Sequence, residues 1–334
     1  MHAVRLHAFG PAENLSYEKA EDPVPGPGQV RIAVAAAGVH LLDTAVREGH
    51  QGPLPALPEL PTVPGREVAG TVDALGAGTD PGWLGKRVVA HLGPVPGGYA
   101  ELAVTGAERL HEIPAGLDEA AAVAMIGTGR TALGILQFAA LGPDAVALVP
   151  AAAGGIGTLL VQYAKNAGAT VVGLAGGPAK TAAVTANGAD LAVDYRLPDW
   201  HRRVAGFLGD RPATVVFDSV GGDTGRLAVD LLGPGGQHLV FGWSGGGLLD
   251  GGPLTFTEEE LTRRGITSEI VLGPVMLARA GGPDPLRTLE TRALAEAAAG
   301  RLVPAVQRFP LGAAAAAHRA LEGRATMGKV VLEP

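Results

Sequence analysis

A glycine-rich segment at residues 150–157 has the composition of a loop that binds phosphate. It contains Ala152-x-Gly154-x-x-Gly157 and lies between an apolar run and a segment with helical spacing. In such a loop the second glycine lets the backbone approach a pyrophosphate, and the third lets the helix pack close to the sheet. The helix N-terminus adds N–H donors and a positive dipole end. The pattern favours a dinucleotide site, although a turn whose glycines serve only packing would have the same letters.

The next expected strand bears on the choice between NAD and NADP. An acidic residue about 20 positions after the loop would bind a ribose 2′-hydroxyl group, but residues 171–184 (VVGLAGGPAKTAAV) contain none. Small residues followed by Lys180 suit a 2′-phosphate, which needs room and positive charge. We therefore expect NADPH as the cofactor. Taken alone, Lys180 is also consistent with a solvated helix residue.

The composition excludes several other kinds of chemistry. The 334 residues include no cysteine, so disulfides, thiolate metal ligands and a cysteine nucleophile are excluded. The net charge of -7 without a basic cluster disfavours nucleic-acid binding. No uninterrupted apolar run reaches the length of a membrane span, and the first 15 residues lack a secretory signal pattern. These observations predict a cytoplasmic protein without a membrane partner.

The loop requires a parallel sheet, and the second part of the chain has the pattern for one. From about residue 145, short apolar runs alternate with helical segments, which is typical of βαβ units in a doubly wound sheet. The expected strands lie at residues 145–151, 170–175, 189–195, 213–220 and 237–243, and the expected helices at 155–168, 179–188, 199–209 and 224–235.

The first 115 residues differ, because short strands are separated there by glycine and proline as in an irregular β-barrel. Strands are expected at residues 29–39, 67–76, 86–93 and 98–106, followed by a helical segment at 114–136 with Asp118 as its N-cap. After these come a strand at 266–275, helices at 284–300 and 311–323, and a last strand at 328–334. The length of the chain favours two domains.

Nine segments, in order over nearly the whole chain, resemble one known family. They are AAGVHLLDTAVREG (residues 36–49), VPGREVAGTV (63–72), GKRVVA (85–90), GGYAELA (97–103), GTGRTAL (127–133), PAAAGGIGTLLVQYAK (150–165), GADLAVDYR (188–196), VVFDSVGGDT (215–224) and LEGRATMGKVVL (321–332). They resemble the zinc-independent quinone oxidoreductases, which include zeta-crystallin, within the medium-chain dehydrogenase/reductase superfamily. That family accepts alanine at the position of Ala152.

The resemblance implies an α/β fold with two domains and an active site in the cleft. A GroES-like β-barrel domain would comprise residues 1–121 and 267–334, and a doubly wound parallel-sheet Rossmann domain residues 122–266. Zinc-dependent relatives carry a cysteine near the position of His40, a His-Glu pair where this chain has Arg66 and Glu67, and a four-cysteine lobe. Both zinc sites are therefore expected to be absent.

The resemblance also implies which residues bind NADPH. They are Thr131, Gly154, Gly155, Ile156, Gly176, Lys180, Tyr195, Ser219, Phe241, Gly242 and Arg324. Of these, Lys180, Tyr195 and Arg324 would surround the 2′-phosphate. A guanidinium group can bind phosphate at two points, although Arg324 is also consistent with a surface charge on a helix.

His40 and Asp43 are the candidate catalytic residues. The family usually has asparagine beside the nicotinamide where this chain has His40. An imidazole there could donate a hydrogen bond to a substrate carbonyl, or a proton after hydride transfer. It could equally hold the pocket wall through Asp43, and the sequence leaves both roles open.

Without zinc as a Lewis acid, the hydride acceptor must itself be a good electrophile. We therefore expect NADPH-dependent reduction of a quinone or an α,β-unsaturated carbonyl, with a biosynthetic enoyl reductase acting on one specific enone as an alternative. A non-catalytic, crystallin-like protein that binds NADPH or RNA is the alternative of a different class. A zinc alcohol dehydrogenase and an S-adenosylmethionine methyltransferase are further rivals.

The apolar segment at residues 266–275 bears on assembly. An uncovered apolar edge strand invites pairing with a second copy of the chain, and members of the family commonly dimerise through this strand. We therefore predict a homodimer through the edge of the Rossmann sheet. The alternative is that the chain's own C-terminal segment covers the strand.

Overall fold

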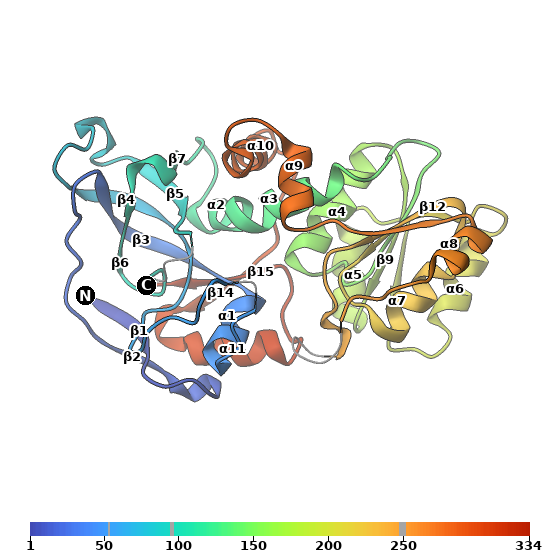
Figure 1. The fold of residues 1–334 in the computed structure, drawn as a ribbon, viewed down its shortest axis with the longest axis horizontal. Coiled ribbons are helices and arrows are strands. Elements are labelled where there is room, and N and C mark those ends of the chain that lie inside the picture. The colour runs from blue at the N-terminus through green and yellow to red at the C-terminus, as the bar shows by residue number, and fades with distance from the viewer. Residues whose placement is uncertain (53, 94–96, 247–251) are drawn as a thin grey trace. The chain divides into compact units, whose positions relative to one another are not determined.

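The protein is described by a computed structural model over residues 1–52, 54–93, 97–246 and 252–334, and its chain forms two compact units (Figure 1). The first comprises Met1–Thr128, Ala293–Ala298 and Pro304–Pro334, and the second comprises Gly129–Arg292 and Ala299–Val303. The sequence placed residues 267–292 with the barrel domain. They belong instead to the second unit, because β13 (Thr267–Ile270) pairs in parallel with β12 (Leu232–Val240).

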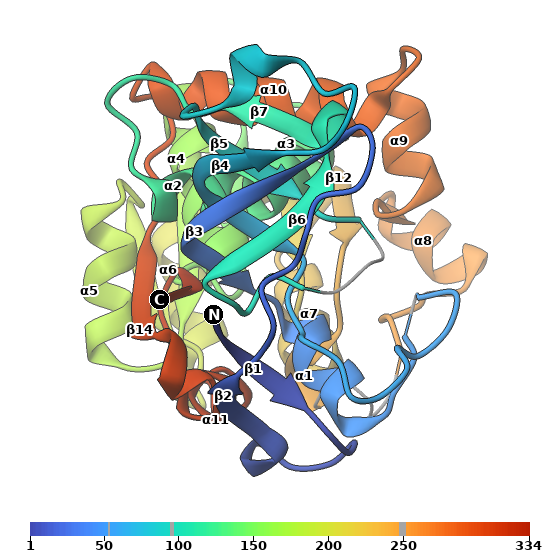
Figure 2. The same cartoon turned by 90° about the vertical axis from the view of Figure 1, so that its left-hand side faces the viewer.

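The first unit is built on a sheet with the strand order β14-β15-β3-β4-β5-β7, in which β6 also pairs with β3 (Figure 2). Its strands are β3 (Gln29–Val39), β4 (Glu67–Leu75), β5 (Arg87–His91), β6 (Leu102–Gly106), β7 (Leu110–Glu112), β14 (Val306–Pro310) and β15 (Lys329–Glu333). A separate antiparallel pair is formed by β1 (His2–Leu6) and β2 (Leu15–Lys19). The expected strands of this unit are confirmed, whereas β1, β2, β7 and β14 were not predicted.

Alternation along β3 explains how this sheet encloses a core. Val30, Ile32 and Val34 are buried, whereas Arg31 and Ala33 between them are partly exposed. Side chains alternate between the two faces of a strand, so the apolar set faces one side. Burying one such side chain contributes about 1.5–3 kcal/mol, which fixes the face that β3 turns inward.

The helical segment expected at residues 114–136 consists of three parts. Asp118 accepts a hydrogen bond from Ala121 N at 2.6 Å and caps α2 (Glu119–Ala124), as predicted. A π-helical turn at Met125–Gly129 follows, and then α3 (Arg130–Leu136), which already belongs to the second unit. Besides α2, the first unit contains the α-helices α1 (Leu41–Glu48) and α11 (Ala314–Glu322).

The second unit contains a six-stranded parallel sheet in the order β10-β9-β8-β11-β12-β13. The strands are β8 (Val146–Val149), β9 (Thr170–Ala175), β10 (Leu191–Asp194), β11 (Ala213–Asp218), β12 and β13. The helices are α3, α4 (Gly155–Asn166), α5 (Pro178–Ala186), α6 (Trp200–Leu208), α7 (Gly222–Val229), α8 (Glu258–Arg264), α9 (Pro274–Ala280) and α10 (Pro285–Ala298), of which the segment Ala293–Ala298 belongs to the first unit. If the strands are numbered 1 to 6 along the chain, their order across the sheet is 3-2-1-4-5-6, which is the doubly wound order. The switch point lies between β8 and β11.

One boundary in this unit differs from the prediction. The helix expected at residues 224–235 ends at Val229, and β12 already begins at Leu232. Pro234 cannot continue a helix and Gly235 has φ 82°, so the chain turns into the strand early. Leu232 pairs with Ala213 and Gln237 with Val215, which places a bulge between them.

The central strand β8 is buried at all four positions, as expected for a parallel strand covered on both faces. Of the helices in the described part of the chain, none is long and apolar enough to cross a membrane.

Candidate functional site

The loop after β8 leads directly into the N-terminus of α4. Ala151 takes the left-handed conformation with φ 53°, and Gly154 is the N-cap of the helix without a side-chain cap. Gly155 and Ile156 form the first turn. The first N–H groups of a helix have no partner within it, so this end presents backbone donors suited to a pyrophosphate.

Two close approaches explain the small residues of this loop. A Cβ atom on Gly157 would lie 2.4 Å from Ala151 O, so only glycine fits there. Ala152 is fully buried, and its N–H donates to Leu174 O at 2.9 Å. A Cβ atom on Gly173 would lie 3.0 Å from Ala152 Cβ. The alanine methyl is therefore accommodated because the neighbouring strand carries glycine opposite it.

Most of the predicted cofactor residues lie at the carboxyl ends of the parallel strands. Gly176 follows β9, Tyr195 follows β10, Ser219 follows β11, and Phe241 and Gly242 follow β12. These ends share one edge of the sheet, which is where ligands bind in open α/β sheets.

The turn that carries Ser219 is held by a buried carboxylate. Asp218 Oδ1 accepts from Val220 N at 2.8 Å and from Gly221 N at 2.9 Å. Its Oδ2 atom lies 3.1 Å from His238 Nε2, and both side chains are fully buried. These buried contacts of Asp218 fix the turn in which Ser219 lies.

Lys180 lies in the first turn of α5 and is half-buried. The structure adds Arg196, which the sequence analysis did not single out although it follows Tyr195 directly. A Cβ atom on Gly177 would lie 2.6 Å from Arg196 Nη2, so this guanidinium runs along the glycine turn after β9. Arg196 also pairs with Asp194 at 2.8 Å and holds the pKa of that carboxyl far below its usual range.

The remaining two cofactor candidates lie elsewhere. Thr131 lies in α3, within the second unit. Arg324 follows α11 in the first unit, is exposed, and has the left-handed φ of 53°. The second unit alone therefore brings together the loop, Lys180 and Tyr195, whereas Arg324 belongs to the first unit.

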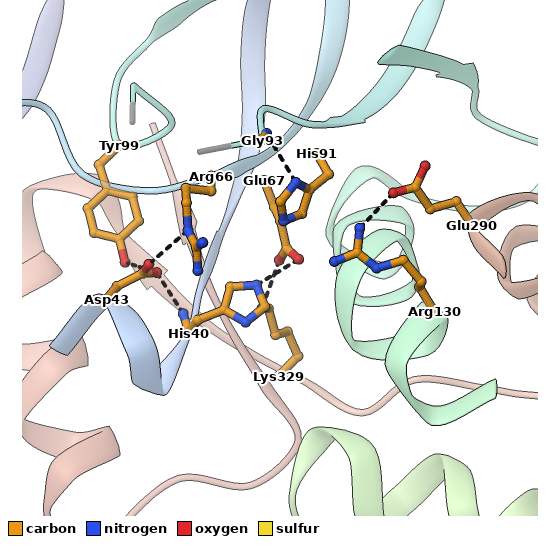
Figure 3. Close-up of polar contacts among 10 residues, drawn as sticks. All are labelled: His40, Asp43, Arg66, Glu67, His91, Gly93, Tyr99, Arg130, Glu290 and Lys329. Carbon is orange, nitrogen blue, oxygen red and sulfur yellow. Dashed lines mark hydrogen bonds and ion pairs between the residues drawn. The ribbon is translucent and has the colours of Figure 1, made fainter. Parts of the chain in front are cut away.

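His40 lies at the junction of β3 and α1, where it forms the N-cap of the helix (Figure 3). Asp43 Oδ2 accepts from His40 N at 2.8 Å. The return contact from the imidazole ring to Asp43 N does not have hydrogen-bond geometry, and that N–H donates to His40 O at 3.0 Å instead. Asp43 therefore holds the backbone of His40 and leaves its ring to other partners.

Asp43 is itself held by a buried chain of polar groups. Tyr99 Oη lies 3.1 Å from Asp43 Oδ2 and 3.1 Å from His318 Nε2. Burial and the Asp43 charge raise the pKa of Tyr99 well above its usual value, and burial lowers the pKa of His318 to about 4. Both groups are thus neutral near pH 7. His318 donates to Tyr99, and Tyr99 donates to the Asp43 carboxylate.

The ring of His40 faces a buried ion pair. His40 Nε2 lies 2.6 Å from Glu67 Oε1 and 2.9 Å from Lys329 Nζ, and Lys329 Nζ lies 2.8 Å from Glu67 Oε2 (Figure 3). The side chain of Glu67 is fully buried, and that of Lys329 is 4% exposed. Burial alone would raise the pKa of Glu67, but the charges of His40 and Lys329 hold it well below its usual value. Neither Glu67 oxygen has a hydrogen-bond partner among the residues that the structure describes, so these contacts are mainly electrostatic.

Two glycines leave the space that Glu67 occupies. A Cβ atom on Gly127, in the π-helical turn, would lie 1.5 Å from Glu67 Oε1, and one on Gly38 would lie 2.3 Å from Glu67 Oε2. The carboxylate is therefore packed between backbone segments of β3 and of the turn after α2. This packing holds the carboxylate beside His40 and Lys329, and the charge of His91 on the neighbouring strand also lowers its pKa.

This arrangement gives the His40 ring a partner for each protonation state. A protonated Nε2 meets the negative charge of Glu67, whereas an unprotonated Nε2 can accept from the Lys329 ammonium; one nitrogen cannot do both at once. A ring with 25% side-chain exposure can also exchange protons with a ligand or with water. The cluster is thus suited to move a proton.

Sequence reasoning named Glu67 only as part of a lost zinc pair and missed Lys329, Tyr99 and His318. A signal for Lys329 was present, because a lysine that begins the apolar strand KVVLE needs a buried acidic partner. In the described residues, no group of three or more His, Cys, Asp or Glu side chains could hold a metal ion.

Comparison with known proteins places this geometry in a family. Residues 26–115 match the alcohol dehydrogenase GroES-like domain, and residues 155–270 match the zinc-binding dehydrogenase domain. The chain is 33% identical to a quinone oxidoreductase of Pseudomonas aeruginosa over 99% of both chains. It is also 33% identical to a 2-haloacrylate reductase of a Burkholderia species, over 99% of this chain and 98% of that protein.

A solved structure agrees. The Escherichia coli quinone oxidoreductase complexed with NADPH superposes with a TM-score of 0.84 and 28% identity over the whole of both chains. The likeness covers both the GroES-like unit and the Rossmann unit, which confirms the predicted fold. The chain therefore belongs to the quinone oxidoreductase family of the medium-chain dehydrogenase/reductase superfamily.

Proposed function

We propose that the protein is an NADPH-dependent oxidoreductase that reduces a quinone or an α,β-unsaturated carbonyl compound without zinc. The observation that carries this proposal is the glycine loop at the switch point of the 3-2-1-4-5-6 sheet, in a chain of the quinone oxidoreductase family. The relative named as a 2-haloacrylate reductase supports the conjugated substrate, because an acrylate has a C=C bond conjugated with a carboxyl group.

NADPH fits the second unit better than NADH. The turn after β9 carries two glycines and no acidic residue of its own, and Lys180 and Arg196 bring positive charge to it. Arg196 also pairs with Asp194, whose carboxylate accepts from the Gly177 backbone. We assign the pyrophosphate to the α4 N-terminus and the 2′-phosphate to Lys180, Tyr195 and Arg196 of the second unit, while Arg324 stays a prediction from the resemblance. The structure of the NADPH-bound Escherichia coli relative supports this cofactor.

His40 is the proposed proton donor. Bound NADPH would supply a hydride, which leaves negative charge on the oxygen of the reduced carbonyl or enone. His40 would then give a proton to the resulting oxyanion or enolate, so that hydride and proton together complete a two-electron reduction. Glu67 and Lys329 hold the ring, and water reprotonates it.

Zinc independence rests on the side chains that face His40. The chain has no cysteine, and the Lys329 ammonium already contacts both Glu67 and His40. A divalent cation at this place would meet a fixed positive charge. Dialysis against a chelator is therefore expected to leave activity unchanged, and elemental analysis that finds stoichiometric zinc required for turnover would contradict the proposal.

The main test combines binding and turnover. Fluorescence titration should show that NADPH binds more tightly than NADH, and the wild type should oxidise NADPH with benzoquinone or benzoylacrylate methyl ester. His40→Phe keeps a planar ring that can neither donate nor accept a proton, and it should lower kcat by about 10²- to 10⁴-fold, the usual contribution of a proton donor, while NADPH binding stays unchanged. Failure to bind NADPH would refute the enzyme assignment. An unchanged kcat in His40→Phe would mean that His40 is a structural residue only.

We also propose a homodimer through β13. This strand forms the edge of the parallel sheet, and Ile270 on it is 50% exposed. A parallel edge with an exposed apolar side chain offers unpaired backbone groups to a second copy.

A further inference from the structure

The first unit contains an apolar pocket of about 290 Å³ beside the His40 cluster. Its walls come from β1, α1 and the proline-rich segment that leads to β4. The lining side chains are mostly aliphatic, and they include Leu6, Val46, Leu54, Leu57, Pro58 and Pro64. A cavity of about 150 Å³ holds benzene, so this pocket has room for an aromatic ring with a short substituent.

Three charged residues also line this pocket: Asp43, Arg47 and Arg66. Arg47 is almost fully buried, and its Nη2 lies 2.6 Å from both Glu48 and Glu322. Its Nη1 atom is buried and has no hydrogen-bond partner among the residues that the structure describes. An unpaired buried donor on a guanidinium is unfavourable, and an anion in the pocket would remove that penalty.

Arg66 supplies the second positive charge. Its Nε lies 3.7 Å from Asp43 Oδ1, which is too far for a hydrogen bond (Figure 3). Asp43 instead accepts from His40 N and Tyr99 Oη. The Arg66 side chain is only 16% exposed. The Nε edge of this guanidinium faces Asp43, so a ligand anion would meet its Nη atoms.

These features define the ligand by its chemistry. A pocket with aliphatic walls and a few placed polar groups selects an apolar body and fixes its orientation. Guanidinium groups bind carboxylates in a planar, two-point geometry. The polar end of the pocket is also tied to the proposed proton donor, because Asp43 holds the His40 backbone and Arg66 immediately precedes Glu67.

We propose that this pocket binds the carboxylate and apolar body of an acidic substrate, an α,β-unsaturated carbonyl compound that also carries a carboxyl group. This inference rests on the proposed function, and it narrows the substrate class from neutral quinones and enones to acidic enones. Arg66 is the specificity-determining residue, and Leu57 contributes to the apolar wall.

Benzoylacrylate and its methyl ester make a matched pair of probes, since they share the enone and the ring and differ in one negative charge. The wild type should show a higher kcat/KM for the acid. Arg66→Gln should lower kcat/KM for the acid by about 10- to 100-fold, mainly through KM, because a hydrogen bond to a charged group contributes about 1.5–3 kcal/mol. In the same variant, kcat/KM for the ester should change by less than about twofold, because only the interaction with the ligand's charge is lost.

Two further variants separate charge from shape. Lys86→Gln removes the same charge from an exposed site on the first unit and should leave kcat/KM for both the acid and the ester unchanged. Leu57→Trp should fill the pocket and raise KM for both the acid and the ester.

A binding measurement keeps the inference separate from turnover. Benzoylpropionate, the saturated acid, cannot accept a hydride at a C=C bond, and calorimetry should detect its binding to the wild type but not to Arg66→Gln. Equal losses for acid and ester in Arg66→Gln, or benzoylpropionate binding unaffected by that change, would overturn the acidic-substrate inference while NADPH oxidation with the ester persists. Absence of NADPH oxidation with the acid, the ester and benzoquinone alike would instead refute the proposed function.

Discussion

Lys329 Nζ and Glu67 Oε2 lie 2.8 Å apart in the interior of the first unit, where neither side chain has more than 4% exposure. The pair joins the last strand, β15, to the start of β4. It also contacts the ring of His40, so the ion pair connects the stability of the fold to the candidate site.

Breaking this pair should be strongly destabilising. Lys329→Met and Glu67→Gln should each lower the free energy of unfolding by about 3–5 kcal/mol, because each leaves the other charge buried without its main partner. The double variant should recover a large part of that loss. Urea unfolding of the four proteins gives the coupling free energy.

The exposed pair Lys86 and Glu112, 3.1 Å apart, is the matched control. The same double-mutant cycle there should give a coupling of about 1 kcal/mol or less. If the losses of unfolding free energy in Glu67→Gln and Lys329→Met were simply additive in the double variant, the two charges would not stabilise one another.

Gly127→Ala should damage the same cluster from the other side. The added Cβ atom would lie 1.5 Å from Glu67 Oε1, so the carboxylate or the π-helical turn must move. Overpacking of this kind typically costs about 1–3 kcal/mol. We expect a lower urea midpoint and reduced kcat, because Glu67 would no longer hold His40.

Gly206→Ala in α6 provides the comparison, since nothing lies within 4 Å of a Cβ atom there. Alanine favours the helix by about 1 kcal/mol over glycine, so this variant should be slightly more stable. Equal stability of Gly127→Ala and the wild type would mean that the turn adapts without strain.

His318 should make stability depend on pH. Its pKa is about 4 in the folded protein because of burial, against 6.5 as the ordinary value. The unfolded chain therefore takes up the proton first, so this contribution is complete above about pH 6.5 and is lost as the pH falls toward 4. The full loss is about 3 kcal/mol at most.

Urea unfolding of the wild type and His318→Gln between pH 7 and pH 4.5 measures this effect. The variant should lose less stability over that range, whatever its stability at pH 7. His50→Gln, at an exposed position, should follow the wild-type slope. Parallel slopes for His318→Gln and the wild type would mean that His318 is accessible to protons in the folded state.

Lys180 and Arg196 should determine the preference for NADPH. Lys180→Ala and Arg196→Ala should each raise the Kd for NADPH by about 10-fold and leave NADH unchanged, since a charged hydrogen bond to phosphate contributes about 1.5–3 kcal/mol. Arg202→Ala, an exposed arginine on α6, is the control for a general loss of charge. Fluorescence titration distinguishes the outcomes. An equal rise in Kd for NADPH and NADH would mean that the 2′-phosphate does not bind at this turn.

The β13 edge can be tested by charge. Ile270→Lys should convert the proposed dimer to a monomer in analytical ultracentrifugation, because lysine on an edge strand blocks pairing. Phe207→Lys, at a similarly exposed apolar residue of α6, should leave the assembly unchanged. A wild-type monomer at micromolar concentration would contradict the dimer.

The parallel sheet and the glycine loop with Gly154 could be predicted from the letters alone, because strand and helix periodicities are local properties. In a parallel sheet the carboxyl ends of the strands fall on one edge, and Gly176, Tyr195 and Ser219 lie at such ends. That these three residues bind NADPH was implied by the resemblance to the quinone oxidoreductases and stays a prediction. The absence of cysteine likewise follows from the letters alone.

How the candidate proton donor is held depends on contacts between distant segments of the chain. Glu67 and Lys329 are separated by most of the chain, and their contact arises because β15 returns to pair with β3, which pairs with β4. The sequence left open whether His40 acts through its ring or through Asp43. In the structure Asp43 binds the backbone N–H of His40, and the Glu67–Lys329 ion pair contacts its ring. Contacts between segments so far apart depend on sheet register, which local patterns do not specify.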